Sequence, residues 1–287
     1  MHFLKYILGS AFFILFIAAC NLEKEIDLDL PVYESQPVVE CYLEPGKPFY
    51  LLLTKSASYF DPFPADITGF LENIQEKGAT VIIRNKDKEY LLAEGIYIDF
   101  QTQKVFNYGN TELVPEDFDN DFELEIRLAN GKTITSATKI LPIVPIDSVV
   151  VEFKSAEVKD SLARVLTYFK DANLSAENFF RRQLHWNSLT DSIPQQDFIA
   201  TDRFAENGKI VFGTGYTFPE GDTIYNTLYH ISPAYFDYLE SVFNAAASNG
   251  NPFGQPSRII SNLDGDANAI GVFTGLSYVR VMTIVKR

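Results

Sequence analysis

The chain has 287 residues and a formal net charge of −14 at neutral pH, because 38 acidic residues outnumber 24 basic ones. Nucleic acids and anionic lipid headgroups need a cationic surface, so this charge argues against both as partners. The length leaves room for one large domain or two medium-sized domains, each with its own core.

Residues 1–19 have the pattern of a secretory signal peptide. A short basic start is followed by an apolar run, and the small residues Ala18 and Ala19 stand directly before Cys20. The apolar run is shorter than the roughly 20 residues that a helix needs to cross a hydrocarbon core. We therefore expect this segment to direct export and not to remain as a membrane-spanning anchor.

The end of the signal, Ile-Ala-Ala-Cys, resembles a bacterial lipobox. The resemblance implies that Cys20 is lipidated and becomes the first residue of the mature chain. Two or three acyl chains there would hold the protein on a membrane, because each buried methylene contributes about 0.8 kcal/mol. The alternative is an ordinary signal peptide that happens to precede a cysteine. We interpret residues 20–36 as a lipidated, acidic tether.

Cys41 is the other cysteine of the chain, so no intramolecular disulfide can form once Cys20 carries lipid. Cys41 alternates with Val39 and Leu43 in a strand pattern, which places the three side chains on one face. Free cysteines are often buried and behave as small apolar residues. We therefore predict a buried thiol.

The first predicted domain, residues 37–141, has the pattern of antiparallel β-structure. Its clearest hairpin lies at 122–138, where Asn130 and Gly131 favour the positive φ angles of a type I′ turn. A second hairpin is expected at 78–92. Apolar and polar residues alternate in these strands, as in sheets with one solvated face. We predict an immunoglobulin- or prealbumin-like β-sandwich.

A second β-rich domain is predicted for residues 146–287. The segment 139–146 carries two prolines and is expected to be a linker, because proline lacks the N–H that a sheet ladder needs. Further on, the Asn-Gly pair at 207–208 is expected to turn a hairpin between 203–204 and 210–212. The expected fold class is mainly β, with two antiparallel domains that are sandwich-like or barrel-like.

One amphipathic helix is predicted at 233–248. Ser232 is a favourable N-cap, and Pro233 suits the first helical position. Apolar residues from Tyr235 to Ala246 recur at helical spacing. An amphipathic helix in a β-rich domain has to lay its apolar face on a sheet or over a barrel mouth.

The sequence contains no familiar catalytic or metal-binding motif. His185 and His230 have no carboxylate or second histidine at metal-ligand spacing, so we expect hydrogen-bonded strand histidines, no metal and no cofactor. The segment from Asp264 to Asn268 begins like a calcium loop, but Gly275 stands where a bidentate Glu is required. We interpret this segment as a turn and do not expect an enzyme.

Aromatic residues are the remaining candidates for recognition. The chain has 24 Phe and 15 Tyr, and most of these side chains must fill β-sheet cores. Tyr59 and Phe60 lie in one predicted loop and Phe253 in another, and Trp186 is the single tryptophan. We take these four residues as candidate contacts with a ligand or a protein partner.

Several segments, in order along the chain, resemble one family: CNLEKEIDLDLP, PVVECYLEPGKPFYLLLTKSASYFDP, GATVIIRNKDKEYLL, PIDSV, GDTIYNTLYHISPAYFDYLESV and NPFGQPSRIISNLDGDANAIGVFTG. This family consists of Bacteroidota lipoproteins that carry a domain of unknown function. Its members are typically encoded beside TonB-dependent outer-membrane receptors of the starch-utilisation type. The resemblance implies a surface-exposed lipoprotein of the outer membrane that assists a transporter, and Cys20 is the one residue whose role carries over.

Three functions are compatible with these patterns. The leading hypothesis is a non-enzymatic accessory protein of a TonB-dependent transporter, which contacts the receptor or its substrate. The alternative is a surface lipoprotein that binds a glycan or a peptide by itself. A third, an extracellular hydrolase, lacks a motif that would assign a nucleophile or a base. An accessory protein should expose an apolar patch that is too large for a solitary monomer, whereas a glycan binder should expose coplanar aromatic rings.

The substitution Cys20→Ser tests the acyl anchor. Without the sulfur that carries the lipid, we expect the variant to leave the membrane fraction or to accumulate as unprocessed precursor. Immunoblots of membrane and soluble fractions measure both outcomes, with the wild type as the membrane-bound reference. A variant that is processed normally and stays with the membranes would contradict a lipidated Cys20.

Overall fold

The computed structural model describes residues 34–57, 73–155, 161–170, 176–190, 194–205, 207–248 and 258–287. Residues 35–287 belong to one compact unit. The predicted signal peptide, most of the tether and four candidate residues lie outside the described part of the chain: Cys20, Tyr59, Phe60 and Phe253.

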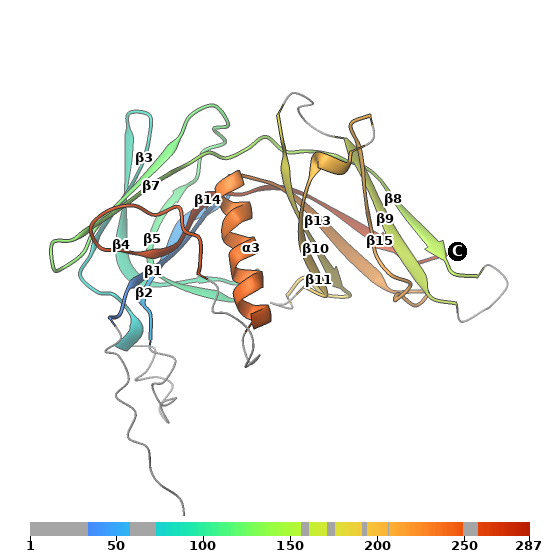
Figure 1. The fold of residues 1–287 in the computed structure, drawn as a ribbon, viewed down its shortest axis with the longest axis horizontal. Helices are drawn as coiled ribbons and strands as arrows, with labels where there is room; N and C mark the ends of the chain where they lie inside the picture. Colours follow the sequence, from blue (N-terminus) through green and yellow to red (C-terminus); the bar gives the residue numbers. More distant parts are fainter. Residues whose placement is uncertain are drawn as a thin grey trace, which may run out of the picture. The chain divides into compact units, whose positions relative to one another are not determined.

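The largest sheet has eight strands in the order β14-β1-β2-β5-β4-β3-β6-β7 (Figure 1). All neighbours run antiparallel except β14 and β1. The sheet curls until β7 approaches β14, where the Gly275 N–H donates to Thr138 Oγ1 at 3.4 Å. The predicted mainly-β, barrel-like class is confirmed. The strands are β1 (Pro37–Leu43), β2 (Pro48–Lys55), β3 (Thr80–Asn85), β4 (Lys88–Asp99), β5 (Lys104–Leu113), β6 (Phe122–Arg127), β7 (Thr133–Thr138) and β14 (Ile270–Gly275).

Alternate side chains of this sheet form one apolar core. Val39, Cys41 and Leu43 of β1 are fully buried, as their alternating pattern predicted, and they share the core with Phe122 and Ile126 of β6. Burying such an apolar side chain stabilises the fold by about 1.5–3 kcal/mol. Burial also raises the pKa of the Cys41 thiol, so the thiol stays protonated and is a poor nucleophile.

The β6–β7 hairpin was placed correctly by the sequence, but its turn type was predicted wrongly. Gly131 has a φ of +85°, whereas Asn130 does not adopt a positive φ. The Leu128 carbonyl accepts from the Gly131 N–H at 2.9 Å, and the Leu128 N–H donates to the Lys132 carbonyl at 2.9 Å. These bonds define a three-residue loop that ends in a left-handed glycine, which is the next most common hairpin connection after the two-residue turns.

Two smaller sheets complete the described structure, with the orders β11-β10-β13-β15 and β12-β9-β8. Aromatic rings join the two sheets. The centroid of Phe169 of β9 lies 5.0 Å from that of Phe180 of β10, and the centroid of Phe212 of β12 lies 4.9 Å from that of Phe198 of β11. The strands are β8 (Ile146–Phe153), β9 (Ala163–Lys170), β10 (Phe179–Trp186), β11 (Gln196–Thr201), β12 (Lys209–Gly213), β13 (Thr223–Ile231) and β15 (Ser277–Ile284).

The hairpin predicted around the Asn-Gly pair at 207–208 is not formed. Both residues have positive φ angles and make a turn, as Asn-Gly pairs favour. However, residues 202–204 form a short 3₁₀ helix, η1, instead of a strand. The strand before it, β11, pairs with β10, while β12 after the turn pairs with β9. The turn therefore passes the chain from one sheet to the other.

Helix α3 (Pro233–Ser248) has the bounds that the sequence predicted. Ser232 acts as the N-cap, because its hydroxyl accepts from the Tyr235 N–H at 3.2 Å. The helix contacts β10, β11 and β14. Its buried residues Tyr235 and Leu239 belong to one apolar cluster with Ile231 and Val272. Since β10 and β14 belong to different sheets, the helix lies against both.

Strand β14 brings a C-terminal segment into the first sheet. It lies beside β1 at the edge of this sheet (Figure 1). The two strands run parallel, in a register that pairs Val39 with Gly271 and Cys41 with Phe273. A single residue, Leu276, then separates β14 from β15 of the four-stranded sheet, and its N–H donates to the Leu43 carbonyl at 2.8 Å. The chain thus crosses the predicted linker once and later returns to the first sheet. No sequence pattern indicated this pairing.

Gly271→Ala tests how closely β14 approaches β1. Gly271 has a φ of +128°, and an added Cβ would lie 1.9 Å from the Val39 carbonyl oxygen. We expect the substitution to lower the free energy of unfolding by roughly 3 kcal/mol or more, or to prevent folding. Gly46→Ala is the matched control, because Gly46 also has a positive φ but nothing lies within 4 Å of the added Cβ.

The control should cost about 1 kcal/mol, the strain of a left-handed alanine. Urea unfolding of both variants measures the difference. Equal losses at the two positions would show that the contact between β14 and β1 is looser than the structure indicates.

Candidate functional site

The β4–β5 hairpin carries exposed apolar side chains on one face. Ile96, Ile98 and Phe100 alternate along the end of β4 and into the turn, and Val105 of β5 is the direct cross-strand partner of Ile98. Ile96 is 79% exposed and Phe100 is 82% exposed. We name these four residues the apolar hairpin.

Aromatic contacts fasten the other face of this hairpin to the sheet. The Tyr97 ring covers Gly109, where a Cβ atom would lie only 2.9 Å from the ring carbons. Tyr50 of β2 stacks on Phe106, with 5.4 Å between ring centroids and 16° between ring planes, and lies 5.7 Å from Tyr97. This packing holds the backbone of the apolar hairpin in place, so its exposed side chains have a fixed position.

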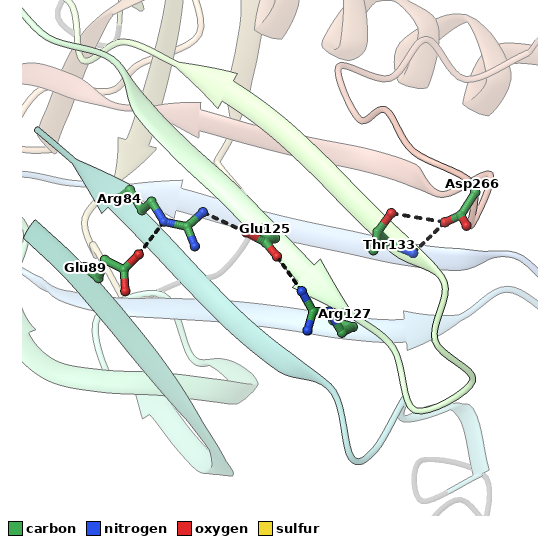
Figure 2. Close-up of polar contacts among 6 residues, drawn as sticks. All are labelled: Arg84, Glu89, Glu125, Arg127, Thr133 and Asp266. Carbon is green, nitrogen blue, oxygen red and sulfur yellow. Dashed lines mark hydrogen bonds and ion pairs between the residues drawn. The ribbon is translucent and has the colours of Figure 1, made fainter. Parts of the chain in front are cut away.

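The neighbouring strands expose charges instead. Figure 2 shows a series of ion pairs across β4, β3 and β6, in which Arg84 donates to Glu89 at 2.6 Å and to Glu125 at 2.7 Å. Arg127 also donates to Glu125, at 3.2 Å. Exposed pairs of this kind contribute only about 0–1 kcal/mol each, but they keep the surface hydrophilic. The apolar hairpin is a local departure from this pattern.

A second distinctive surface lies on the β11-β10-β13-β15 sheet. On the side opposite Phe180, cross-strand register places Arg181, Tyr229 and Tyr278 in one row. The adjacent row holds Asp197, Gln183, Thr227 and Arg280, one from each strand. We name this surface the polar–aromatic face, and it consists of Arg181, Gln183, Asp197, Thr227, Tyr229, Tyr278 and Arg280.

Arg181 organises one end of the polar–aromatic face. Its guanidinium forms a bidentate ion pair with Asp197, with distances of 2.8 Å and 2.5 Å, and donates to the Tyr235 hydroxyl of α3 at 2.6 Å. Gln183 donates to Asp197 and accepts from the Tyr229 hydroxyl, both at 3.1 Å. Burial lowers the pKa of Arg181, but Tyr235 and Asp197 outweigh it, so the pKa is raised and the charge is permanent.

Arg280 occupies the other end and is held by neutral groups. Its Nε donates to Thr227 Oγ1 at 2.8 Å, and its guanidinium lies 5.1 Å from the centroid of the Tyr278 ring. Within the described chain, Arg280 belongs to no ion pair. Its orientation is therefore fixed while its charge is left without a carboxylate.

A family model described as a domain of unknown function, DUF4249, matches residues 23–280. The chain belongs to the DUF4249 family. No curated protein matches this chain. The family description names no activity.

The inner face of β10 holds an arginine that the sequence analysis overlooked. Arg182 lies between Phe180 and Leu184 and is fully buried. Its Nε donates to Asn226 Oδ1 at 2.9 Å and its Nη1 lies 3.5 Å from Gln196 Oε1, but Nη2 has no partner among the described residues. Without a paired carboxylate, burial lowers the pKa of Arg182 to about 10. The alternation of β10 could have revealed it, because 180, 182 and 184 share one face.

Trp186 is the one sequence-predicted contact residue that the DUF4249 structure describes. It is half-buried and packs edge-on against Phe218, with 5.7 Å between ring centroids. It belongs to the apolar cluster of Leu184 and Val285, on the opposite side of β10 from the polar–aromatic face. Its role in ligand contact stays a prediction, and the structure does not bring it together with Arg181 or Arg280.

His230 and the Asp264–Asn268 segment make hydrogen bonds to other parts of the fold. His230 bonds to the Pro142 carbonyl at 2.9 Å and to Asn178 at 3.3 Å, so it is a hydrogen-bonded strand histidine as predicted. The Thr133 N–H and hydroxyl donate to Asp266 at 2.5 Å and 3.2 Å (Figure 2). The Oδ1 atom of Asp266 is therefore already used by hydrogen bonds from Thr133 of β7. The described residues contain no group of three His, Cys, Asp or Glu side chains placed to hold a metal.

No helix in the described ranges of the DUF4249 chain combines the length and apolar character that crossing a bilayer would require.

The tyrosine beside Arg181 predicts a pH dependence of stability. Burial raises the pKa of Tyr235 to about 12, although Arg181 lowers it, whereas an unfolded tyrosine titrates near pH 10. Between pH 10 and pH 12 the unfolded state therefore releases this proton and the folded state keeps it. The stability that the raised pKa of Tyr235 adds to the folded state is therefore fully present below pH 10, and it is lost as the pH rises toward 12.

Tyr235→Phe removes this titration. The free energy of unfolding in urea should fall less steeply above pH 10 for the variant than for the wild type. Tyr216→Phe removes a solvent-exposed phenol and is the matched control, which should keep the wild-type slope. An unchanged slope in Tyr235→Phe would mean that the Tyr235 hydroxyl is open to solvent.

Proposed function

We propose that this DUF4249 protein is a lipid-anchored, non-enzymatic accessory of a TonB-dependent outer-membrane transporter. The observation that carries the proposal is the apolar hairpin, in which Ile96, Ile98, Phe100 and Val105 stand exposed on one face. Contiguous exposed apolar patches are uncommon on solitary soluble proteins and usually mark interaction sites. The hairpin is therefore assigned to the contact with the receptor.

The construction of the hairpin suits a protein interface. Phe100 and the isoleucines are large anchors of the kind that fill pockets at the centre of an interface, while the tyrosines beneath them limit the entropy lost on binding. The net charge of −14 disfavours an anionic lipid surface as the partner. A protein receptor is the partner that best fits an apolar surface on an acidic chain.

The expected acyl anchor is compatible with the same role. Cys20 would hold the mature chain on the outer membrane through its acyl groups, on the cell surface, with residues 20–36 as the tether. The match to the DUF4249 family extends over residues 23–280 and so includes the apolar hairpin. The proposed protein remains beside its receptor by attachment to the same membrane.

A second candidate function is a surface lipoprotein that binds a glycan or a peptide by itself. The polar–aromatic face favours it, because Arg280 is a partly exposed side chain whose guanidinium, beside the Tyr278 ring, can hydrogen-bond a ligand. This function needs no receptor. The two candidates therefore differ in whether the apolar hairpin has an occupant.

The pair Val105→Glu and Val211→Glu tests the receptor contact. Val105 is 52% exposed in the apolar hairpin, and Val211 is 48% exposed on β12, so the two changes add the same charge to similarly exposed strand valines. Each variant is pulled down from its own outer membrane in mild detergent, and the co-purifying proteins are quantified by mass spectrometry.

We expect a stoichiometric TonB-dependent receptor with the wild type and with Val211→Glu. Val105→Glu should lose it by about 30-fold, the effect of removing roughly 2 kcal/mol at the centre of an interface. Recovery of the lipoprotein alone from wild-type membranes, or equal recovery of the receptor by both variants, would contradict the proposal.

A further inference from the structure

We propose that the outer face of β15, centred on Arg280, binds the C-terminal carboxylate of a peptide whose last side chain is apolar. This site is separate from the apolar hairpin. It does not depend on a receptor, so binding to the isolated protein tests it independently of the proposed function.

The pairing of arginines across the chain singles out Arg280. In this strongly acidic protein, most arginines of the described chain lie within 4 Å of a carboxylate: Arg84, Arg127, Arg164, Arg181, Arg203 and Arg287. Arg182 is fully buried, and Arg258 is exposed outside the sheet. Arg280 is the half-buried arginine on a sheet face whose charge has no acidic partner among the residues described.

The position of Arg280 is determined before any ligand binds. The bond from its Nε to Thr227 Oγ1 uses one of its five donors, and the Tyr278 ring supports the guanidinium plane. The nitrogens at the end of the guanidinium keep the fork that binds a carboxylate in bidentate fashion. Because the side chain is already oriented, binding an anion costs little rotamer entropy.

The acidic groups that the structure describes near this face are already paired. Asp197 is held by Arg181 at 2.5 Å, and Glu44, whose charge acts on Tyr229 from the turn after β1, lies 2.7 Å from Lys47. Within the described part of the chain, Arg280 therefore leaves this face with an unmatched positive charge, although the protein as a whole is strongly negative. A negatively charged group is the complement that the face lacks.

The apolar part of the ligand follows from the residues beyond Arg280. Met282 and Ile284 continue the same face of β15 at two-residue intervals, and each is at least half exposed. Tyr225 of β13 is the cross-strand partner of Met282 and provides an aromatic neighbour. This area is open and only two side chains long, so it matches one amino-acid side chain better than a long alkyl chain, which needs an enclosed cavity.

The aromatic geometry disfavours a sugar ring as the ligand. The rings of Tyr229 and Tyr278 are inclined by 50° with 5.1 Å between centroids, so they do not form a flat platform. Stacking of a pyranose needs a flat aromatic surface. A carboxylate on Arg280 with an apolar side chain on Met282 requires no such platform.

Isothermal titration of the purified full-length protein measures the binding. The probe is acetyl-Ala-Ala-Ala-Leu with a free C-terminal carboxylate, and the same peptide with a C-terminal amide is the chemical control. We expect amidation to weaken binding at least tenfold, since it removes the charge from the group that Arg280 contacts. This comparison needs no variant and is independent of any effect on folding.

Arg280→Gln should weaken binding of the free-carboxylate peptide at least tenfold, to the level of the amide. Arg258→Gln, which removes an exposed arginine elsewhere, should bind as the wild type does. Met282→Ser should reduce the preference for a final Leu over a final Ser. Thermal unfolding of each variant checks that Thr227 and its neighbours are still packed.

The proposal would be overturned by no binding of the free-carboxylate peptide, by equal binding of the acid and the amide, or by equal binding by Arg280→Gln and the wild type. Binding of an acidic oligosaccharide in place of the peptide would also overturn it. Arg280→Lys separates charge from geometry, because it keeps the charge but loses the planar fork, and it should bind more weakly than the wild type.

Discussion

The parallel pairing of β14 with β1 is the constraint on which the arrangement of the chain depends. It requires Gly271, whose missing side chain lets the Val39 carbonyl approach, and it places a C-terminal segment at the edge of the first sheet. Because Leu276 alone separates β14 from β15, the same stretch of backbone continues into the four-stranded sheet. Helix α3, which precedes β14, packs Tyr235 and Leu239 against Val272 of β14 and against Leu276, the residue that joins β14 to β15. The polar–aromatic face and the first sheet are thus linked by a continuous, hydrogen-bonded segment and not only by the proline-containing linker.

Strand β10 shows how one pattern can serve two different environments. Arg181 and Arg182 are adjacent in sequence but point to opposite faces, as the strand geometry demands. Arg181 has a carboxylate and a tyrosine hydroxyl as partners, and its charge is stabilised. The partners that the structure describes for Arg182 are amide oxygens and the nearby Phe198 ring, so its burial costs stability that the surrounding aromatic core has to offset. Asn226 continues this polar contact to Thr167 of β9 and so connects the two smaller sheets through their core.

The two candidate surfaces differ in the physical basis of recognition. The apolar hairpin offers a non-directional surface on a rigid aromatic support, which suits a lasting contact with another protein. The face around Arg280 offers one oriented charge beside a small apolar area, which suits a short ligand with a defined end. In the role proposed above, the apolar hairpin would keep the protein with its receptor, and the face around Arg280 would contact a ligand.

Local pattern was enough to place many elements. The alternation of Val39, Cys41 and Leu43 predicted a buried face, and Ser232-Pro233 predicted the start of α3, because these signals depend on neighbours in sequence. The Asn-Gly pairs were recognised as turns, but at 130–131 the loop is longer than predicted, and at 207–208 the turn connects different sheets. Which strands pair after a turn is decided by packing over long sequence distances. Local residues do not encode it.

For the candidate surfaces, too, local sequence patterns predicted one part and long-range packing decided the rest. Aromatic type alone selected Trp186, which lies in an apolar cluster, and missed Ile98 and Arg280, whose significance depends on exposure and on absent partners. By itself, the sequence determined the mainly-β class, the helix with its cap and the buried thiol, because periodicity and capping act within a few residues. Only the tertiary structure decided that β14 joins β1 and that Arg182 is buried. It also decided that, among the residues described, Arg280 has no acidic partner and four apolar residues of one hairpin remain exposed. These outcomes depend on which side chains meet across strands far apart in the chain, and that choice is made by the packing of the whole fold.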